Sequence, residues 1–207
     1  MGMTTLVLKH RYGNYGLLAY IDLAFILSVA LVASYNFLFP QVRDVVTSQQ
    51  FQILSLEIWT IGIILSVITV KNISLGLGQD LFDGTIVTFL QIKNKRTVFF
   101  ILYTLDVLAI SLLFITISEI TFLLSSFRPP LIWIEEFISQ YLFICNLSYL
   151  ITLLIKRPFR SFFISIFIIL SLLGAEVVGL AYIFYYFLPV DFLLIYFSYH
   201  IFKRMSI

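Results

Sequence analysis

Apolar runs long enough to cross a bilayer dominate this chain and constrain its fold more than any other feature. A hydrocarbon core of about 30 Å needs about 20 mostly apolar residues per helix. Only 12% of the 207 residues are charged, about half the fraction usual in a soluble domain. The sequence therefore predicts an all-α, polytopic transmembrane helical bundle. Four separate runs are Leu17–Phe39, Phe51–Val70, Thr97–Leu124 and Leu131–Ile155.

The last apolar stretch, Ser161 to Phe202, is too long for one crossing. It holds about 42 residues without a lysine or an arginine, which suits two spans joined by a tight turn near Glu176 to Gly179. One long helix followed by a short re-entrant piece would also fit, because Pro189 and Asp191 interrupt the end of the stretch. The two-span arrangement gives six predicted spans in all.

The basic residues are distributed in a way that predicts the orientation of the spans. With six spans, eleven of the thirteen lysines and arginines fall on one side, and only Arg43 and Arg128 fall on the other. By the positive-inside rule that side is the cytoplasm. We therefore expect a multi-pass protein of the cell membrane with both termini cytoplasmic. The eleven residues are Lys9, Arg11, Lys71, Lys93, Lys95, Arg96, Lys156, Arg157, Arg160, Lys203 and Arg204.

The spans leave little of the chain for a soluble domain, so residues 1–207 are predicted to form a single transmembrane domain. Residues 1–16 mix apolar, aromatic and basic side chains, which fits an N-terminal interfacial segment or an ordinary flanking anchor. The only cysteine, Cys145, lies inside an apolar run and excludes a disulfide framework within the chain. The expected surroundings are membrane lipid, and no nucleic-acid partner is expected.

Residues 83–96 form the longest segment that is neither apolar enough for lipid nor polar enough for a free linker, and they end a predicted cytoplasmic segment, residues 71–96. Between Leu77 and Leu90 an apolar stripe has spacings of four, one, four, three and one positions, which traces one face of a helix. Gly84 interrupts this stripe and indicates a bend. We expect an amphipathic helix along the cytoplasmic face. The stripe consists of Leu77, Leu81, Phe82, Ile86, Phe89 and Leu90.

A motif within this segment resembles one that a known family carries between its second and third spans. Here Asp80 and Asp83 are followed by Gly84-Thr85-Ile86, then by the pair Phe89-Leu90, and finally by Arg96. The membrane subunits of ABC exporters of the type-two permease class have acidic residues, Gly-Thr, an aliphatic residue, usually a Glu, a Leu pair and a Pro-x-Ser-Arg run. The six-span layout matches as well. The chain departs from the family at Val87, Lys93 and Lys95, where Glu, Pro and Ser are usual.

The resemblance implies a coupling role and a set of partners. In such exporters this cytoplasmic helix sits in a groove of a separate ATP-hydrolysing subunit, and two permease chains form the pathway. It implies a separate ABC ATPase subunit and a homodimer or heterodimer with a related permease. No P-loop occurs in this chain, so any ATPase is another polypeptide. The implied ATPase-coupling residues are Asp80, Asp83, Gly84, Thr85, Ile86, Phe89, Leu90 and Arg96.

Acidic residues within the apolar runs are the candidates for a pathway. Ionisable groups in lipid are costly, so Asp106, Glu119 and Glu176 each prompt a functional hypothesis, with a packed or hydrogen-bonded role as the alternative. Asp106 and Glu119 are about 20 Å apart along a helix and cannot form one acid–base dyad. His10 and His200 both lie near the cytoplasmic ends. We therefore expect no enzyme active site and no cofactor.

Two functions of different classes fit these patterns. The first is a permease subunit of an ATP-driven exporter. The second is a non-catalytic structural or accessory subunit of a larger membrane assembly, such as a respiratory complex. The segment 71–96 favours the permease, because a scaffold has no need for an ordered amphipathic helix with an Asp-Gly-Thr run.

Overall fold

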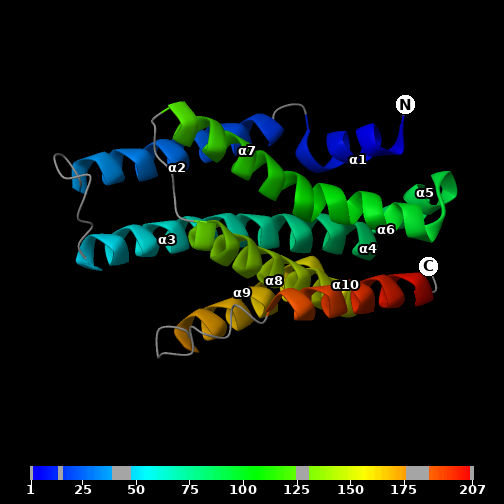
Figure 1. The fold of residues 1–207 in the computed structure, drawn as a ribbon. Coiled ribbons are helices and arrows are strands. Elements are labelled where there is room, and N and C mark those ends of the chain that lie inside the picture. Colours follow the sequence, from blue (N-terminus) through cyan, green and yellow to red (C-terminus); the bar gives the residue numbers. More distant parts are fainter. Residues whose placement is uncertain (1, 14–15, 39–47, 125–130, 176–186, 206–207) are drawn as a thin grey trace.

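The computed structural model describes residues 2–13, 16–38, 48–124, 131–175 and 187–205. These residues form helices and short connections, with no strand among them (Figure 1). The predicted all-α fold class is therefore confirmed. Within these described ranges, four helices are long and apolar enough to cross a membrane, which fits a multi-pass membrane protein. They are Leu17–Phe37, Thr60–Phe82, Lys95–Leu124 and Phe137–Ile155.

The described part of the chain contains ten α-helices and two π-helical turns, which we label η1 and η2. In chain order they are α1 (Met3–Tyr12), α2 (Gly16–Leu38), α3 (Ser48–Asn72), η1 (Ile73–Leu77), α4 (Gly78–Phe82), α5 (Thr85–Ile92), α6 (Lys95–Tyr103), η2 (Thr104–Leu108), α7 (Ala109–Leu124), α8 (Leu131–Ile155), α9 (Pro158–Ala175) and α10 (Phe187–Arg204).

The helix of the second apolar run continues past Val70, the end that its hydropathy predicts. α3 passes through η1 into α4, so one rod extends to Phe82. Gly84 ends this rod because its backbone takes a φ of 75°, a left-handed conformation that glycine adopts without steric cost. The expected surface helix is therefore two elements, the end of the rod and the separate helix α5, with the bend at Gly84 where the sequence indicated one.

The last two helices, α9 and α10, contain 18 residues each. At 1.5 Å per residue this is about 27 Å, slightly less than the hydrocarbon thickness. They are not among the four described helices that are long and apolar enough to cross a membrane. The expected turn near Glu176 to Gly179 lies outside the described residues. Four spans are thus supported, and the count of six stays a prediction.

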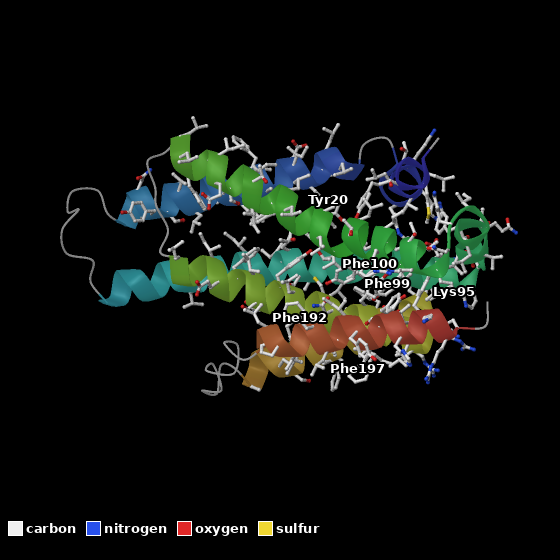
Figure 2. All side chains as sticks on the ribbon, turned by 45° about the vertical axis from the view of Figure 1, so that its right-hand side comes forward. Tyr20, Lys95, Phe99, Phe100, Phe192 and Phe197 are labelled. Atoms are coloured by element: carbon white, nitrogen blue, oxygen red, sulfur yellow. The ribbon has the colours of Figure 1, made fainter. Side chains whose placement is uncertain are left out.

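The core of the bundle forms around α8, which packs against α3, α9 and α10, whereas α2 packs mainly against α7. Aromatic rings from α6, α8 and α10 meet at Phe99, whose ring centroid lies 5.8 Å from that of Tyr149 and 5.6 Å from that of Phe202 (Figure 2). All three side chains are fully buried. Such close aromatic packing fixes these helices relative to one another. α2 is at the edge, with only 17% of its span buried.

The basic residues gather at one end of the bundle, which we call the basic end. It carries α1, α5, the α8–α9 connection and the last turn of α10 (Figure 1). Lys93, Lys156, Arg157, Lys203 and Arg204 belong to these elements. The grouping of charges expected from the sequence is thus a grouping in space. Arg43 and Arg128, expected on the other side, lie outside the described residues.

Candidate functional site

α4 and α5 meet in a sharp corner at the basic end. Asp83 and Gly84 separate the two helices, and the Asp83 amide donates to the Gln79 carbonyl (N···O 2.8 Å), which closes the last turn of α4. After α5, the Asn94 side chain accepts from the Thr97 amide (2.9 Å) and caps α6. α5 is therefore a separate helix of eight residues between two long rods, the first formed by α3, η1 and α4 and the second by α6, η2 and α7.

The apolar face of α5 is buried against its own chain. Ile86 and Phe89 are each 1% exposed. The Phe89 ring meets the His10 ring of α1 edge-on, with centroids 6.0 Å apart, and Thr85 and Leu90 are partly buried. Five of the six stripe residues thus pack at least partly against the chain's own bundle, and Leu77, Ile86 and Phe89 are fully buried. Phe82 is the exception and is exposed.

The opposite face of the corner is exposed and keeps an apolar part. Phe82 is 62% exposed, Ile92 47% and Val87 39%. Among the implied coupling residues, Asp83 and Arg96 are also exposed, and Asp83 accepts a hydrogen bond from the Gln79 side-chain amide. We call the exposed set the outer surface of the corner. It consists of Phe82, Asp83, Val87, Thr88, Gln91 and Ile92.

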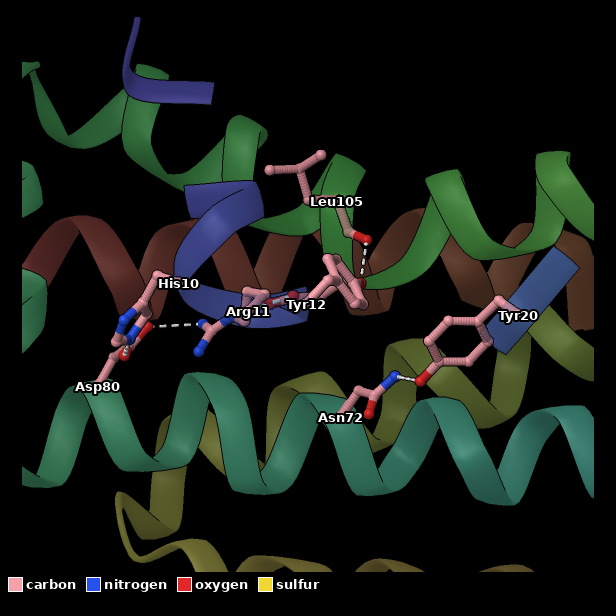
Figure 3. A network of polar contacts seen from close by, with 8 residues as sticks. His10, Arg11, Tyr12, Tyr20, Asn72, Asp80 and Leu105 are labelled. Carbon is pink, nitrogen blue, oxygen red and sulfur yellow. Dashed lines mark hydrogen bonds and ion pairs between the residues drawn. The ribbon is translucent and has the colours of Figure 1, made fainter. Parts of the chain in front are cut away.

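A buried ion-pair cluster joins α1 to two other helices (Figure 3). Arg11 contacts Asp80 of α4 through Nη2 (2.6 Å to Oδ2) and Asp106 of η2 through Nε (3.2 Å to Oδ1). His10 Nε2 lies 3.0 Å from Asp80 Oδ1. The next residue, Tyr12, donates its hydroxyl to the Leu105 carbonyl (2.8 Å). These contacts tie α1 across both long rods.

The sequence of α1 explains why Arg11 points inward. Met3, Val7 and Arg11 are four residues apart and therefore lie on one face of the helix. Met3 and Val7 are buried, and the Arg11 side chain is only 5% exposed. α1 ends at Gly13, which has a φ of 60°. This N-terminal segment is therefore a helix packed on the bundle by one face.

The cluster holds one guanidinium against two carboxylates in a nearly dry site. The side chains of Asp80 and Asp106 are 2% and 0% exposed. Burial lowers the pKa of Arg11, but the carboxylates of Asp106 and Asp80 raise it by more, so its pKa lies above the usual value. Arg11 therefore stays charged.

Arg11 also lies next to a residue of each π-helical turn. Asp106 belongs to η2, and Gly76 of η1 is so close that an added Cβ would lie 2.8 Å from Arg11 Nη1. π-helical turns interrupt the regular hydrogen-bond pattern and often occur at functional sites. The two rods are therefore least regular at the level where α1 holds them together.

Two of the acidic residues proposed for a pathway lie in the described part of the chain, in different surroundings. Asp106 belongs to the Arg11 cluster, and Glu119 is exposed on α7, beside a small and mostly apolar hollow of about 70 Å³. Glu176 lies outside the described residues. Asp80, expected to face a partner, is instead buried against Arg11.

Lys95, one of the departures from the family motif, has a contact of its own. Its ammonium donates to the Lys203 carbonyl (3.3 Å) and to the Met205 carbonyl at the end of α10. Figure 2 shows Lys95 beside this end of α10. A cation is favourable at the carbonyl end of a helix. The start of α6 and the end of α10 are thus joined at the basic end.

The left-handed backbone at Gly84 allows a direct test of the corner. Gly84→Ala should lower the free energy of unfolding by about 1 kcal/mol, because a Cβ is strained at this φ although nothing lies within 4 Å of it. Gly174→Ala is the matched control, because Gly174 has a helical φ and equally open surroundings. It should be neutral or slightly stabilising. Equal effects in SDS unfolding titrations would contradict the assigned conformation.

No group of three or more His, Cys, Asp or Glu side chains in the described ranges could hold a metal ion. The candidate site is a protein surface together with an ion-pair cluster. Searches of protein-family models, curated proteins and solved structures found no match to this chain.

Proposed function

We propose that this chain is the transmembrane subunit of an ATP-driven exporter and that it binds a separate ATPase through the outer surface of the α4–α5 corner. The observation that carries the proposal is the exposed apolar part of that surface. Phe82, Val87 and Ile92 are exposed at the basic end, each next in the chain to an exposed polar residue, Asp83, Thr88 and Gln91 respectively. Large exposed apolar side chains among polar ones are typical of a surface that binds a partner.

The corner is also suited to pass on movement. α4 is the end of the long rod that contains α3, and α5 leads through two residues into the rod of α6 and α7. A partner that shifts the corner would therefore act on both rods. Arg11 connects the same rods one level further in, beside their π-helical turns. Coupling of a soluble motor to membrane helices needs such a connection.

The remaining parts of the proposal concern assembly and orientation. The basic end faces the cytoplasm by the positive-inside rule, which places the outer surface where an ATPase would be. A second copy or a related permease completes the pathway. α2 is the span with the least burial inside the chain, so it has the most surface left for such a contact.

The proposal is tested by comparing two exposed phenylalanines at the basic end. Phe82 on the corner is 62% exposed and Phe159 at the start of α9 is 69% exposed. The tagged chain is purified from its native membrane in mild detergent, and co-purified proteins are identified. We expect an ATPase with a P-loop. Phe82→Ala should reduce its recovery by about tenfold, as for an interface hot spot, and Phe159→Ala should not.

Two outcomes would overturn the proposal. Recovery of redox subunits without an ATPase would favour the accessory-subunit alternative. An ATPase recovered equally with both variants would show that the outer surface of the corner is not its binding site.

A further inference from the structure

A polar hollow of about 250 Å³ lies between α1 and the rod of α3, η1 and α4. It is much larger than the 10–15 Å³ that one water needs. His10 and Arg11 line it from α1, and Lys71, Gly76 and Gln79 line it from the rod. Its lining thus brings three basic residues together in space from two distant parts of the chain, with one acidic residue, Asp80, which is paired with Arg11 and His10.

Lys71 makes this hollow unusual. It lies within the apolar span Thr60–Phe82, yet its side chain is exposed, and no carboxylate in the described ranges forms an ion pair with it. An ammonium in a membrane segment is costly unless it reaches water or an anion. Arg11 is thus paired with two carboxylates, whereas Lys71 is paired with none in the described ranges.

The depth of the hollow indicates where that partner comes from. The neighbouring Asn72 donates its side-chain amide to the hydroxyl of Tyr20 in the second turn of α2 (Figure 3). Lys71 is thus level with the N-terminal end of α2 rather than with the middle of that helix. The rings of Tyr12 and Tyr20 meet edge-on at this level, with centroids 5.9 Å apart. Tyrosines of this kind concentrate at the headgroup level of a bilayer.

The acceptors of the cluster do not compete for Lys71. Asp80 and Asp106 are both engaged by Arg11, and Asp80 also by His10. Two of the three guanidinium nitrogens face these carboxylates, which leaves Nη1 beside Gly76 at the hollow. Gln79 donates to Asp83 and Asn72 to Tyr20. The donors without an assigned acceptor are therefore cationic, the Lys71 ammonium and Arg11 Nη1.

We propose that this hollow binds a phosphate group, supplied by the headgroup of an anionic phospholipid. Phosphate accepts several charge-assisted hydrogen bonds and suits the combination of a lysine with an arginine. Lys71 is the main contact, with Arg11 Nη1 and His10 beside it. A bound headgroup would sit against α1 and hold it on the rod at the level of the Arg11 cluster. The site does not depend on an ATPase.

The test uses the full chain purified in neutral detergent. Its thermal unfolding midpoint is titrated with phosphatidylglycerol, with a diacylglycerol of the same acyl chains, and with inorganic phosphate at matched ionic strength. A ligand of the folded state raises the midpoint. Lys71→Gln is compared with Lys93→Gln, because Lys93 is an exposed lysine of the basic end that does not line the hollow.

We expect phosphatidylglycerol, and not the diacylglycerol, to raise the midpoint. Lys71→Gln should raise the apparent dissociation constant of the lipid about fivefold, the effect of one lysine near an anionic surface, and Lys93→Gln should leave it unchanged. If inorganic phosphate also raises the midpoint, and Lys71→Gln abolishes that increase, the same site binds phosphate from solution as well as from lipid. No response, an equal response to the diacylglycerol, or an equal effect of both substitutions would overturn the site.

Discussion

Arg11→Met is expected to lower the free energy of unfolding by about 3–5 kcal/mol, the usual cost of removing one partner from a buried ion pair. Methionine fills a similar volume but leaves the carboxylates of Asp80 and Asp106 facing each other without a fixed cation. Both are almost completely buried, so water cannot replace the lost contacts. The effect is measured by SDS titration of the purified chain in mixed micelles, followed by circular dichroism.

Three further variants separate charge from packing. Lys9→Met changes an exposed residue of the same helix and should have little effect. Asp106→Asn should cost much less than Arg11→Met, because one guanidinium and one carboxylate remain paired. Adding Asp80→Asn and Asp106→Asn to Arg11→Met should recover much of the loss. If Arg11→Met and Lys9→Met unfold alike, the cluster does not hold α1 on the bundle.

The helices of this chain could be predicted from hydropathy because length and apolar content decide them locally. The basic end could be predicted as well, since lysines and arginines collect at one side of consecutive spans. The end of the second span could not. The segment after Val70 contains Lys71, Asn72, Gln79 and Asp80, which are typical of a polar surface. Asp80 is instead buried against Arg11 of α1, and the helix continues through it to Phe82. Tertiary contact thus overrides local polarity.

The partners of the cluster could not be predicted from the sequence. Arg11 and Asp106 are 95 residues apart, and Arg11 read as one of several flanking cations. The spacing of Met3, Val7 and Arg11 was the available hint, because it places an arginine on the apolar face of a helix. Periodicity likewise identified the buried stripe of α5, but it could not tell whether the chain's own bundle or a partner covers that face.

The two faces of the corner can be separated by one more substitution. Phe89→Ala should lower the free energy of unfolding by about 3–5 kcal/mol, as for other buried phenylalanines. Phe89 is 1% exposed and its ring contacts His10, so its removal opens a cavity between α5 and α1. Phe82→Ala, on the exposed face, should change stability by no more than about 0.5 kcal/mol. The SDS titration used for Arg11 measures both.

The stability and recovery experiments then assign a role to each face. Phe82→Ala should keep the stability of the chain and lose the ATPase, which is the result expected of a residue that acts only on a partner. Phe89→Ala should lose stability whether or not a partner is present, because the contact it breaks lies within the chain. If Phe82→Ala destabilises the isolated chain as much as Phe89→Ala, the outer surface of the corner is part of the fold, and the partner must bind elsewhere.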